Sequence, residues 1–200
     1  MNSINNVNKY YNPNFSANFS NLEKRAMNEV KEYSALHSVE TCKIIKKGKD
    51  ITDRFDLFET ADYVSVGPKN GNIFGINFGV FGRIFNFKRN IRNATYIHSH
   101  MTEVPLSRPD IIFAIKTKLK KIIAVSPSGK HSTLELEKDS KKLFEHFNVF
   151  DEPLNKYNEL AQQDENVMQN KTLLKIYQDS VKKAWERFVE LTNAKYSSNI

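Results

Sequence analysis

Two nearby stretches, Tyr96-Ile97-His98-Ser99-His100 and Ser107-Arg108-Pro109-Asp110, set the expected order of elements in the middle of the chain. Side chains of an extended segment alternate between two faces, so the two histidines of the first stretch should point to the same side. In the second stretch, serine followed by proline and aspartate is typical of a helix start. The sequence therefore predicts a strand, a loop over residues 101–106 and a helix that ends near Lys118.

The same two stretches contain three residues that suit a metal ion: His98, His100 and Asp110. Imidazole nitrogens and carboxylate oxygens are common ligands of Zn²⁺, and catalytic zinc is usually held by three protein ligands with one position left open. Structural zinc usually takes four protein ligands, often cysteines, whereas this chain has a single cysteine, Cys42. We therefore predict a catalytic zinc site here rather than a structural one.

The chain has 200 residues, of which 40% are hydrophobic, enough for one main core with an added helical part. Its N-terminal region is rich in asparagine and lacks the apolar core of a signal peptide, and no apolar run reaches the roughly 18 residues that a membrane span needs. A single cysteine fits a reducing compartment. We expect a protein without membrane segments and assign it to the cytoplasm.

The net charge of +7 would suit an acidic or nucleic-acid partner, but the lysines are spread along the chain. The two densest runs, residues 43–49 and 116–121, carry apolar residues between or beside the lysines. Such runs are typical of the solvated faces of strands and helices. On the sequence alone, the charge therefore does not identify a partner.

Residues 1–20 are expected to form a disordered N-terminal lead-in segment. Its aromatic side chains, such as Phe19, can pack against the folded domain. The elements predicted after it are a helix at 22–36 that Asn21 caps, and a meander of strands at 39–45, 51–58 and 63–66 with a turn at 47–49. Residues 70–92 contain five phenylalanines and four glycines, and their periodicity fits either a loose helix or extended segments. The secondary structure of this stretch is therefore not predicted.

Beyond the strand at 95–98 and the helix that follows it, a β-hairpin is expected at 121–126 and 130–136. Helices are predicted at 139–147, 154–163 and 170–194, the last with an apolar stripe that we interpret as a packing face. The stripe consists of Leu174, Tyr177, Val181, Ala184, Trp185, Phe188 and Leu191. Together these elements predict an α+β fold with a mixed sheet, with a main domain at 21–137 and a C-terminal helical extension at 138–200.

The pattern of His98-Ser99-His100, six further residues and Ser107-Arg108-Pro109-Asp110 resembles the JAMM metalloprotease family, also called JAB or MPN-plus. Its members carry HxH, a spacer, SxxD and an upstream glutamate on a strand. Glu40, at the start of an expected strand and 58 residues before His98, best matches that glutamate, and Glu59 and Asp62 are weaker alternatives. The resemblance covers roughly residues 22–137 and implies a JAB-like fold, a cytidine-deaminase-like sandwich. The C-terminal helices match no motif of the family.

The resemblance implies that Zn²⁺ bound by His98, His100 and Asp110 lowers the pKa of a coordinated water to about 7. Glu40 would take a proton from this water and pass it to the leaving amine, and Ser107 would stabilise the oxyanion. The implied reaction is hydrolysis of a peptide or isopeptide bond. The implied partner is therefore a peptide or protein, ubiquitin-like proteins among them, while the motif encodes neither the particular substrate nor the oligomeric state.

Three departures from the family concern the surroundings of the site. The spacer is one residue shorter than the common form, Met101 stands where a proline is usual, and Cys42 or Lys43 stands where a glycine is usual after the glutamate. These departures affect the expected substrate groove and leave the ligand residues intact. Among relatives, bacterial RadC-like proteins and domains of phage and toxin systems fit the pattern better than deubiquitinating members.

Other functions and simpler roles stay open at this point. A non-catalytic JAB-fold binding or scaffold module is one alternative, and a RadC-like nucleic-acid-associated protein, favoured by the net charge, is another. Ser107 and Asp110 also fit plain helix capping, and Glu40 also fits a solvent-facing residue at a strand start. The other three histidines lack partners at ligand spacing, and Cys42 is expected to be a small buried residue.

Overall fold

The computed structural model describes residues 17–69, 72–73, 76–77, 79–137 and 140–200. The predicted lead-in lies outside the described residues up to residue 16. The helices are α1 (Asn21–His37), α2 (Gly79–Ile91), α3 (Arg108–Thr117), α4 (Asp151–Ala161) and α5 (Lys171–Thr192), with 3-10 helices η1 (Thr52–Arg54) and η2 (Ser140–Phe150). The strands are β1 (Cys42–Lys46), β2 (Lys49–Asp50), β3 (Phe55–Glu59), β4 (Val64–Pro68), β5 (Asn72–Ile73), β6 (Ile76–Asn77), β7 (Thr95–Ser99), β8 (Lys121–Val125), β9 (His131–Glu135) and β10 (Lys195–Ser198).

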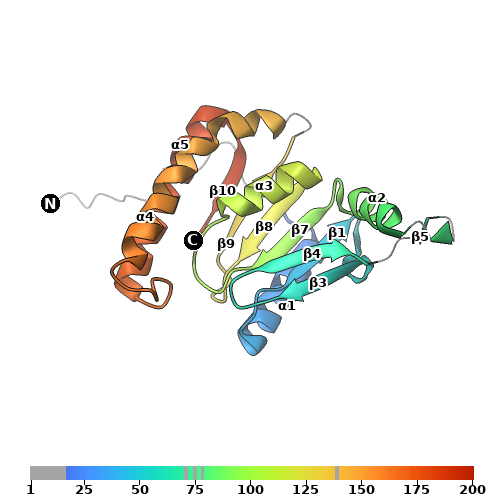
Figure 1. Ribbon diagram of the computed structural model, residues 1–200, viewed down its shortest axis with the longest axis horizontal. Coiled ribbons are helices and arrows are strands. Elements are labelled where there is room, and N and C mark those ends of the chain that lie inside the picture. Colours follow the sequence, from blue (N-terminus) through green and yellow to red (C-terminus); the bar gives the residue numbers. More distant parts are fainter. Residues whose placement is uncertain (1–16, 70–71, 74–75, 78, 138–139) are drawn as a thin grey trace.

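A six-stranded mixed sheet with the order β10-β9-β8-β7-β1-β2 forms the centre of the molecule (Figure 1). Strands β7 and β8 run parallel, whereas the other neighbouring pairs run antiparallel. Parallel neighbours need a crossover, and α3 supplies it between β7 and β8. The β8–β9 pairing is the hairpin that the sequence predicted. The predicted α+β class with a mixed sheet is confirmed.

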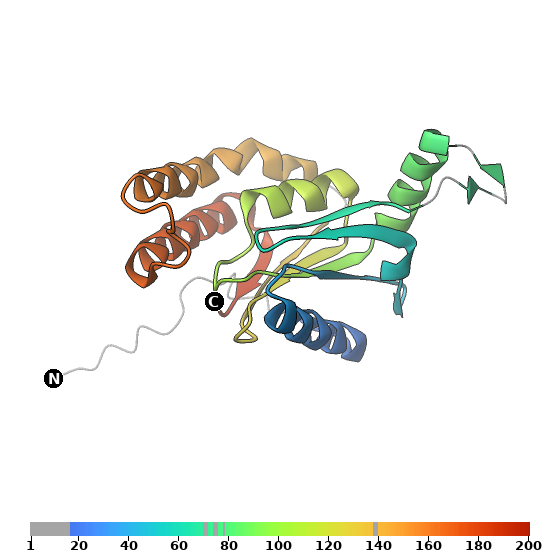
Figure 2. The same cartoon turned by 60° about the horizontal axis from the view of Figure 1, so that its bottom comes forward.

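Each face of this sheet has its own apolar core. Ile97 and Ile123 pack against Ala26 of α1 on one face, while Tyr96 and Ile122 belong to the larger cluster on the other. Figure 2 shows α1 below the sheet, and α3 above it together with the β3–β4 ribbon. Because side chains alternate along a strand, the residue after Ile97 faces the larger cluster, and this places His98 on the α3 side.

The predicted meander of three strands is wrong in its pairing. Strand β1 pairs with β7 and β2, whereas β3 pairs with β4 in a separate two-stranded sheet. The reason lies in the turn at Lys47 and Gly48, both of which have positive φ and return the chain for only the two residues of β2. The 3-10 helix η1 then carries the chain out of the main sheet, and β3 starts a ribbon on the α3 side.

The end of the chain also differs from the prediction. Helix α5 ends at Thr192, its C-cap Asn193 adopts the left-handed conformation, and β10 then pairs with β9 at the edge of the main sheet. Trp185 of α5 stacks on Tyr196 of β10 with ring centroids 3.8 Å apart. The segment 138–200 therefore adds a strand and large aromatic side chains to the core of the main sheet, in addition to its helices. The open stretch at 70–92 contains α2.

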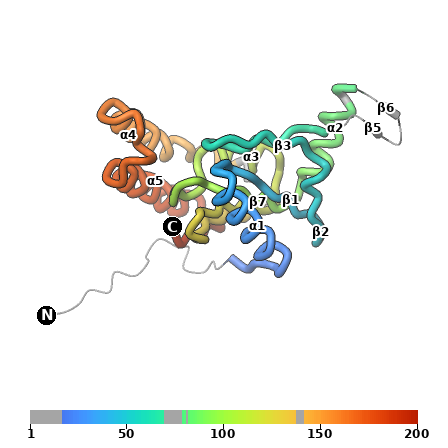
Figure 3. Tube along the Cα trace, turned by 90° about the horizontal axis from the view of Figure 1, so that it is seen from below, coloured from blue at the N-terminus to red at the C-terminus, as the bar shows by residue number. Residues whose placement is uncertain are grey.

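The two ends of the molecule carry different elements. Figures 1 and 3 place α4 and α5 at one end and α2 with β5 at the other. Strands β7 and β8 lie between these ends, and β1 follows on the α2 side. Among the described residues, none of the helices combines the length and the apolar character that a membrane crossing requires.

Glu23 and Lys121 form a buried ion pair between α1 and β8, with Nζ 3.3 Å from Oε1. Glu23 also accepts a hydrogen bond from the Ser20 N–H and so completes the capping box of α1, which makes Ser20 the N-cap instead of the predicted Asn21. Burial on its own would raise the pKa of Glu23, but the Ser20 bond and the Lys121 charge outweigh it and hold the pKa below its usual range. The charged form is thus favoured in the folded protein.

We expect Glu23→Gln to lower the free energy of unfolding at pH 7 by roughly 1.5–3 kcal/mol, since a hydrogen-bonded charge partner of Lys121 is lost while the side-chain shape is kept. A carboxylate with a lowered folded pKa contributes stability above its unfolded pKa and loses it as pH falls through the folded value. Wild type and variant should therefore differ at pH 7, and the difference should shrink as pH falls below the unfolded pKa of about 4.3 and vanish below the lower folded pKa. Urea denaturation at pH 7 and below the folded pKa measures this, and a difference that persists in acid would contradict it.

Candidate metal centre

The candidate site lies where β7 ends and α3 begins. His98 is the fourth residue of β7, and His100 follows the strand, with its N–H donating to Val125 O at the end of β8. The Ser99 side chain points to the opposite side, where its hydroxyl accepts a hydrogen bond from the Thr41 N–H at 2.8 Å. The alternation expected from the sequence thus holds past the end of the strand, and both imidazoles face α3.

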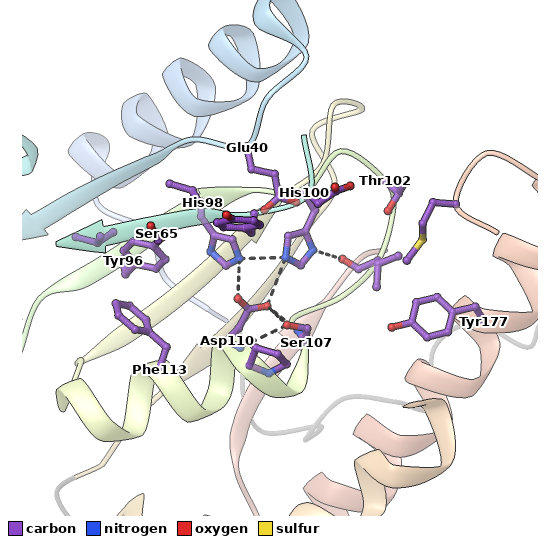
Figure 4. Close-up of a pocket in the computed structure, with 17 residues that line it drawn as sticks. Glu40, Ser65, Tyr96, His98, His100, Thr102, Ser107, Asp110, Phe113 and Tyr177 are labelled. Atoms are coloured by element: carbon purple, nitrogen blue, oxygen red, sulfur yellow. Dashed lines mark hydrogen bonds and ion pairs between the residues drawn. The ribbon is translucent and has the colours of Figure 1, made fainter. Parts of the chain in front are cut away.

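His98, His100 and Asp110 meet at one point (Figure 4). The two Nε2 atoms lie 3.0 Å apart, and they lie 3.2 Å and 3.4 Å from the Asp110 oxygens Oδ1 and Oδ2, respectively. Ligand atoms about 2.0–2.1 Å from a tetrahedral zinc ion would be roughly 3.3–3.4 Å from one another. The three side chains therefore have the donor types and nearly the separations of three corners of such a tetrahedron.

Asp110 is held in place by the start of α3. Ser107 is the N-cap, and its backbone N–H and hydroxyl donate to Asp110 Oδ2 at 2.7 Å and 2.6 Å. Pro109 in the first turn adds the fixed φ that suits a helix start. The predicted helix start is confirmed, and the same capping box fixes the carboxylate with Oδ1 directed at His98.

The two imidazoles are supported differently. Nδ1 of His100 lies 2.8 Å from Val104 O, a contact that requires a proton on Nδ1 and leaves the Nε2 lone pair for a ligand or proton. His98 stacks on Tyr96 with ring centroids 5.3 Å apart, and its buried Nδ1 has no hydrogen-bond partner among the described residues. Backbone contact therefore fixes the tautomer of His100, whereas packing fixes the ring of His98.

Glu40 reaches the site through the register of β1. Cys42 pairs with His98 in the antiparallel β1–β7 ladder, so continuing the register by two residues places Glu40 opposite His100. Glu40 lies in the extended segment just before β1, and its side chain is half-buried in the same pocket as the three candidate ligands. The structure thus brings the predicted base and the predicted ligands together.

Burial raises the pKa of the Glu40 carboxyl to about 7, in spite of the nearby His100, and the Asp110 charge adds to the rise. A hydrogen bond from the Met101 N–H limits it. A carboxyl with this pKa exchanges its proton readily at neutral pH, which is what a general acid–base group needs.

The two alternatives to Glu40 lie differently. Glu59 of β3 accepts hydrogen bonds from Thr41 and Tyr33 outside the pocket. Asp62 in the β3–β4 loop lines the pocket but is exposed to solvent. Glu40 is therefore the carboxylate that combines partial burial with a place beside His100.

The charge distribution of the centre favours a cation. Although burial would raise the pKa of Asp110, contact with His98 and His100 holds it well below its usual range. Burial would lower the pKa of His100, but the Asp110 contact and the Glu40 charge raise it to about 9. A buried carboxylate with a second one nearby thus draws positive charge to this point, whether a proton or a metal ion.

The pocket around the centre has a volume of about 480 Å³. Val64 and Val66 of β4 and Phe113 of α3 form apolar parts of its wall. Tyr177 of α5 and Met168 from the loop before it also line the pocket, and Figure 4 shows the Tyr177 hydroxyl directed toward the site. Tyr177 was predicted only as part of a packing stripe, and its place in this pocket was not predicted from the sequence. A lone hydroxyl in an apolar stripe was the available signal.

Helix α5 also fixes the loop that connects the histidines to α3. Trp185 Nε1 donates to Leu106 O at 2.7 Å, and Gln178 Nε2 donates to Glu103 O at 2.7 Å. Leu106 is in turn held by the Ser132 hydroxyl of β9 through its N–H. Hydrogen bonds from α5 and β9 therefore hold the loop of residues 101–106 in place, and the loop in turn fixes the position of α3 relative to β7.

Cys42 lies outside the chemistry of the pocket. It is 2% exposed, and burial raises the pKa of its thiol to about 12, so it stays protonated and unreactive at neutral pH. The prediction of a small buried residue is confirmed. His131 contacts the Phe19 ring, and His37 lies exposed beside Tyr33, both away from the candidate ligands.

No family model, curated protein or solved structure matches this chain. Its function must therefore be inferred from the residues and geometry of the site itself.

Proposed function

We propose that this protein is a zinc-dependent metallopeptidase of the JAMM type that hydrolyses a peptide or isopeptide bond. The observation that carries the proposal is the convergence of His98, His100 and Asp110 on one point, with Glu40 beside them in the same pocket. The donor set suits zinc, and three protein ligands leave a position for water or substrate. The resemblance of the motif to the JAMM family supports the same conclusion.

Zinc held by these three residues would act as a Lewis acid and lower the pKa of a bound water to about 7. Glu40 would accept a proton at its carboxylate and return it to the leaving amine, a role supported by its place beside His100 in the same pocket. His100 is oriented through Val104 O, and Asp110 through Ser107. The apolar wall formed by Val64, Val66 and Phe113 supports a chain segment of substrate beside the scissile bond.

Ser107 has two roles in this proposal, oxyanion donor and holder of Asp110. A hydroxyl carries one hydrogen, and in this structure it points to Asp110 Oδ2. Stabilisation of an oxyanion thus requires the hydroxyl to turn from Asp110 toward the substrate during the reaction.

We expect Ser107→Ala to lower turnover at saturating zinc by about 100-fold, the lower end for loss of an oxyanion donor. Zinc affinity should fall by about tenfold because Asp110 loses its orienting bond, and stability by roughly 0.5–2 kcal/mol because the N-cap is lost. Peptide hydrolysis, zinc titration and thermal unfolding measure the three effects, with Ser107→Thr as the variant that keeps the hydroxyl. Unchanged turnover at saturating zinc would show that Ser107 acts only through Asp110.

The test of the function itself is the metal content of the purified protein, followed by hydrolysis assays on peptide and isopeptide-linked substrates. One zinc per chain with amide hydrolysis that a chelator abolishes and zinc restores is the expected result. Absence of zinc after metal supplementation would refute the proposal. Bound zinc with no hydrolysis of either substrate class would favour the alternative, a non-catalytic binding module of the same fold.

The single cysteine supports a cytoplasmic location as part of this proposal.

A further inference from the structure

Basic residues that are far apart in the sequence lie together at the end of β1, away from the metal centre. The positive charge is spread along the sequence, but the fold brings the β1–β2 turn and η1 next to the end of α2. The resulting group, here called the basic hollow, consists of Lys46, Lys47, Lys49, Arg54 and Arg89 around a cavity of about 300 Å³. Figure 3 shows β2 and α2 at the same end of the molecule, opposite α4 and α5.

Among the described residues, the lining of the basic hollow consists of five cations with Ile51 and Asn90, and it includes no carboxylate. Two acidic residues, Asp50 and Asp53, adjoin the lining residues in sequence. Of these, Asp50 contacts other groups, Lys43 Nζ at 3.3 Å and the Thr52 N–H at 2.9 Å. Four of the five cations are exposed. Their charges are therefore concentrated on one concave surface and face solvent.

Lys46 is the innermost cation of the group. Its Nζ donates to Arg89 O at 2.6 Å and Asn90 O at 3.1 Å, the carbonyls at the end of α2. Burial lowers the pKa of Lys46, and the charges of Lys47, Arg89, Arg54 and Arg92 lower it further. The positive groups thus repel one another at close range, a cost that a bound anion would relieve.

A second cavity of about 470 Å³ continues the basic hollow. Arg54, Arg89 and Asn90 line both cavities, and the second is also lined by Lys69 and by Phe87, a residue whose ring packs edge-on against Phe55. Asp53, which lines only this second cavity, is its one carboxylate. The site therefore has a strongly cationic part and an adjoining part with an aromatic ring and an amide.

We infer that the basic hollow and its continuation bind a single strand of nucleic acid, with phosphates among the cations and a base in the second cavity. Guanidinium groups match phosphate oxygens in planar pairs, and lysines add charge. An aromatic ring and an amide are groups that contact unpaired bases. A flat membrane surface would not enter a concave site, and an acidic peptide is the alternative that the competition experiment below separates from a nucleic acid. This inference is independent of the zinc proposal.

The test is fluorescence anisotropy with a labelled single-stranded oligonucleotide of about 20 nucleotides, titrated with full-length protein at several salt concentrations. The variant Lys49→Glu/Arg54→Glu removes two cations whose side chains face the hollow. The control Lys24→Glu/Lys171→Glu makes the same change in net charge on exposed sites of α1 and α5. Thermal unfolding verifies that each variant is folded, and Lys49→Gln/Arg54→Gln replaces the first variant if charge reversal unfolds it.

Wild type should bind at low salt, with an affinity that falls steeply as salt rises. The hollow variant should lose at least about tenfold in affinity, and its salt dependence should weaken by roughly 1.4 units of the log–log slope, about 0.7 for each lost phosphate contact to a single strand. The control should stay within about twofold of wild type, since its lost charges lie elsewhere. The inference is overturned if wild type does not bind at low salt, if both variants lose affinity equally, or if polyglutamate of equal charge competes as well as the oligonucleotide.

Discussion

Replacing His98 by alanine is expected to abolish stoichiometric zinc binding, with a loss in affinity well above the roughly 10–100-fold that follows removal of a supporting group. The physical reason is that the site has three protein ligands, all within 4.8 Å of one another, and two donors hold zinc far less tightly than three. Peptide hydrolysis should disappear together with the metal. Elemental analysis after supplementation with zinc and removal of the excess measures the result.

His37→Ala is the matched control, because His37 is exposed on α1 and far from the pocket. It should retain one zinc per chain. His98 is 3% exposed, so its replacement also removes packing against Tyr96. Asp110→Asn provides a second variant of unchanged shape, and it should lose zinc in the same way. Full zinc occupancy in folded His98→Ala and Asp110→Asn would show that zinc binds at another place in the protein.

Glu40→Gln should have the opposite combination of properties: zinc retained and turnover lowered by about 10²–10⁴-fold. Glutamine has nearly the same shape, and its oxygen can still accept the Met101 N–H bond, but it neither accepts nor delivers a proton. Since Glu40 lies opposite His100 and is not among the converging ligands, the metal should remain. Parallel measurements of metal content and of kcat on one peptide substrate test this.

Asp62→Asn serves as the control for Glu40→Gln, because Asp62 lines the same pocket but is exposed. Its turnover should stay within about threefold of wild type, given that an exposed charge interacts weakly through solvent. If Asp62→Asn lost activity and Glu40→Gln kept it, Asp62 would be the base. If both variants kept activity, proton transfer would involve neither Glu40 nor Asp62, and the JAMM-type mechanism with a glutamate base would be refuted.

Much of the local structure followed from short-range sequence signals. The start of α3 at Ser107 and the β8–β9 hairpin depend on contacts within a few residues, and both were predicted correctly. The same holds for the convergence of the two histidines on one face, since strand alternation is a local property. Prediction was poorer where a segment must choose a distant partner. Pairing of β1 with β7 and of β10 with β9 joins residues 50 or more positions apart, and local propensity contains no information about such partners.

The sequence by itself determined which chemical groups are present and which of them lie near one another along the chain. His98, His100 and Asp110 are close in sequence, so one strand, one loop and one helix bring them together. Only the tertiary structure decided the place of Glu40, because the Cys42–His98 register sets it opposite His100. The tertiary structure also decided the place of α5, whose Trp185 donates a hydrogen bond to the loop of residues 101–106. It likewise formed the basic hollow, whose charges come from segments about 40 residues apart. Long-range strand pairing and helix packing create these arrangements, and neither is encoded in any single stretch of sequence.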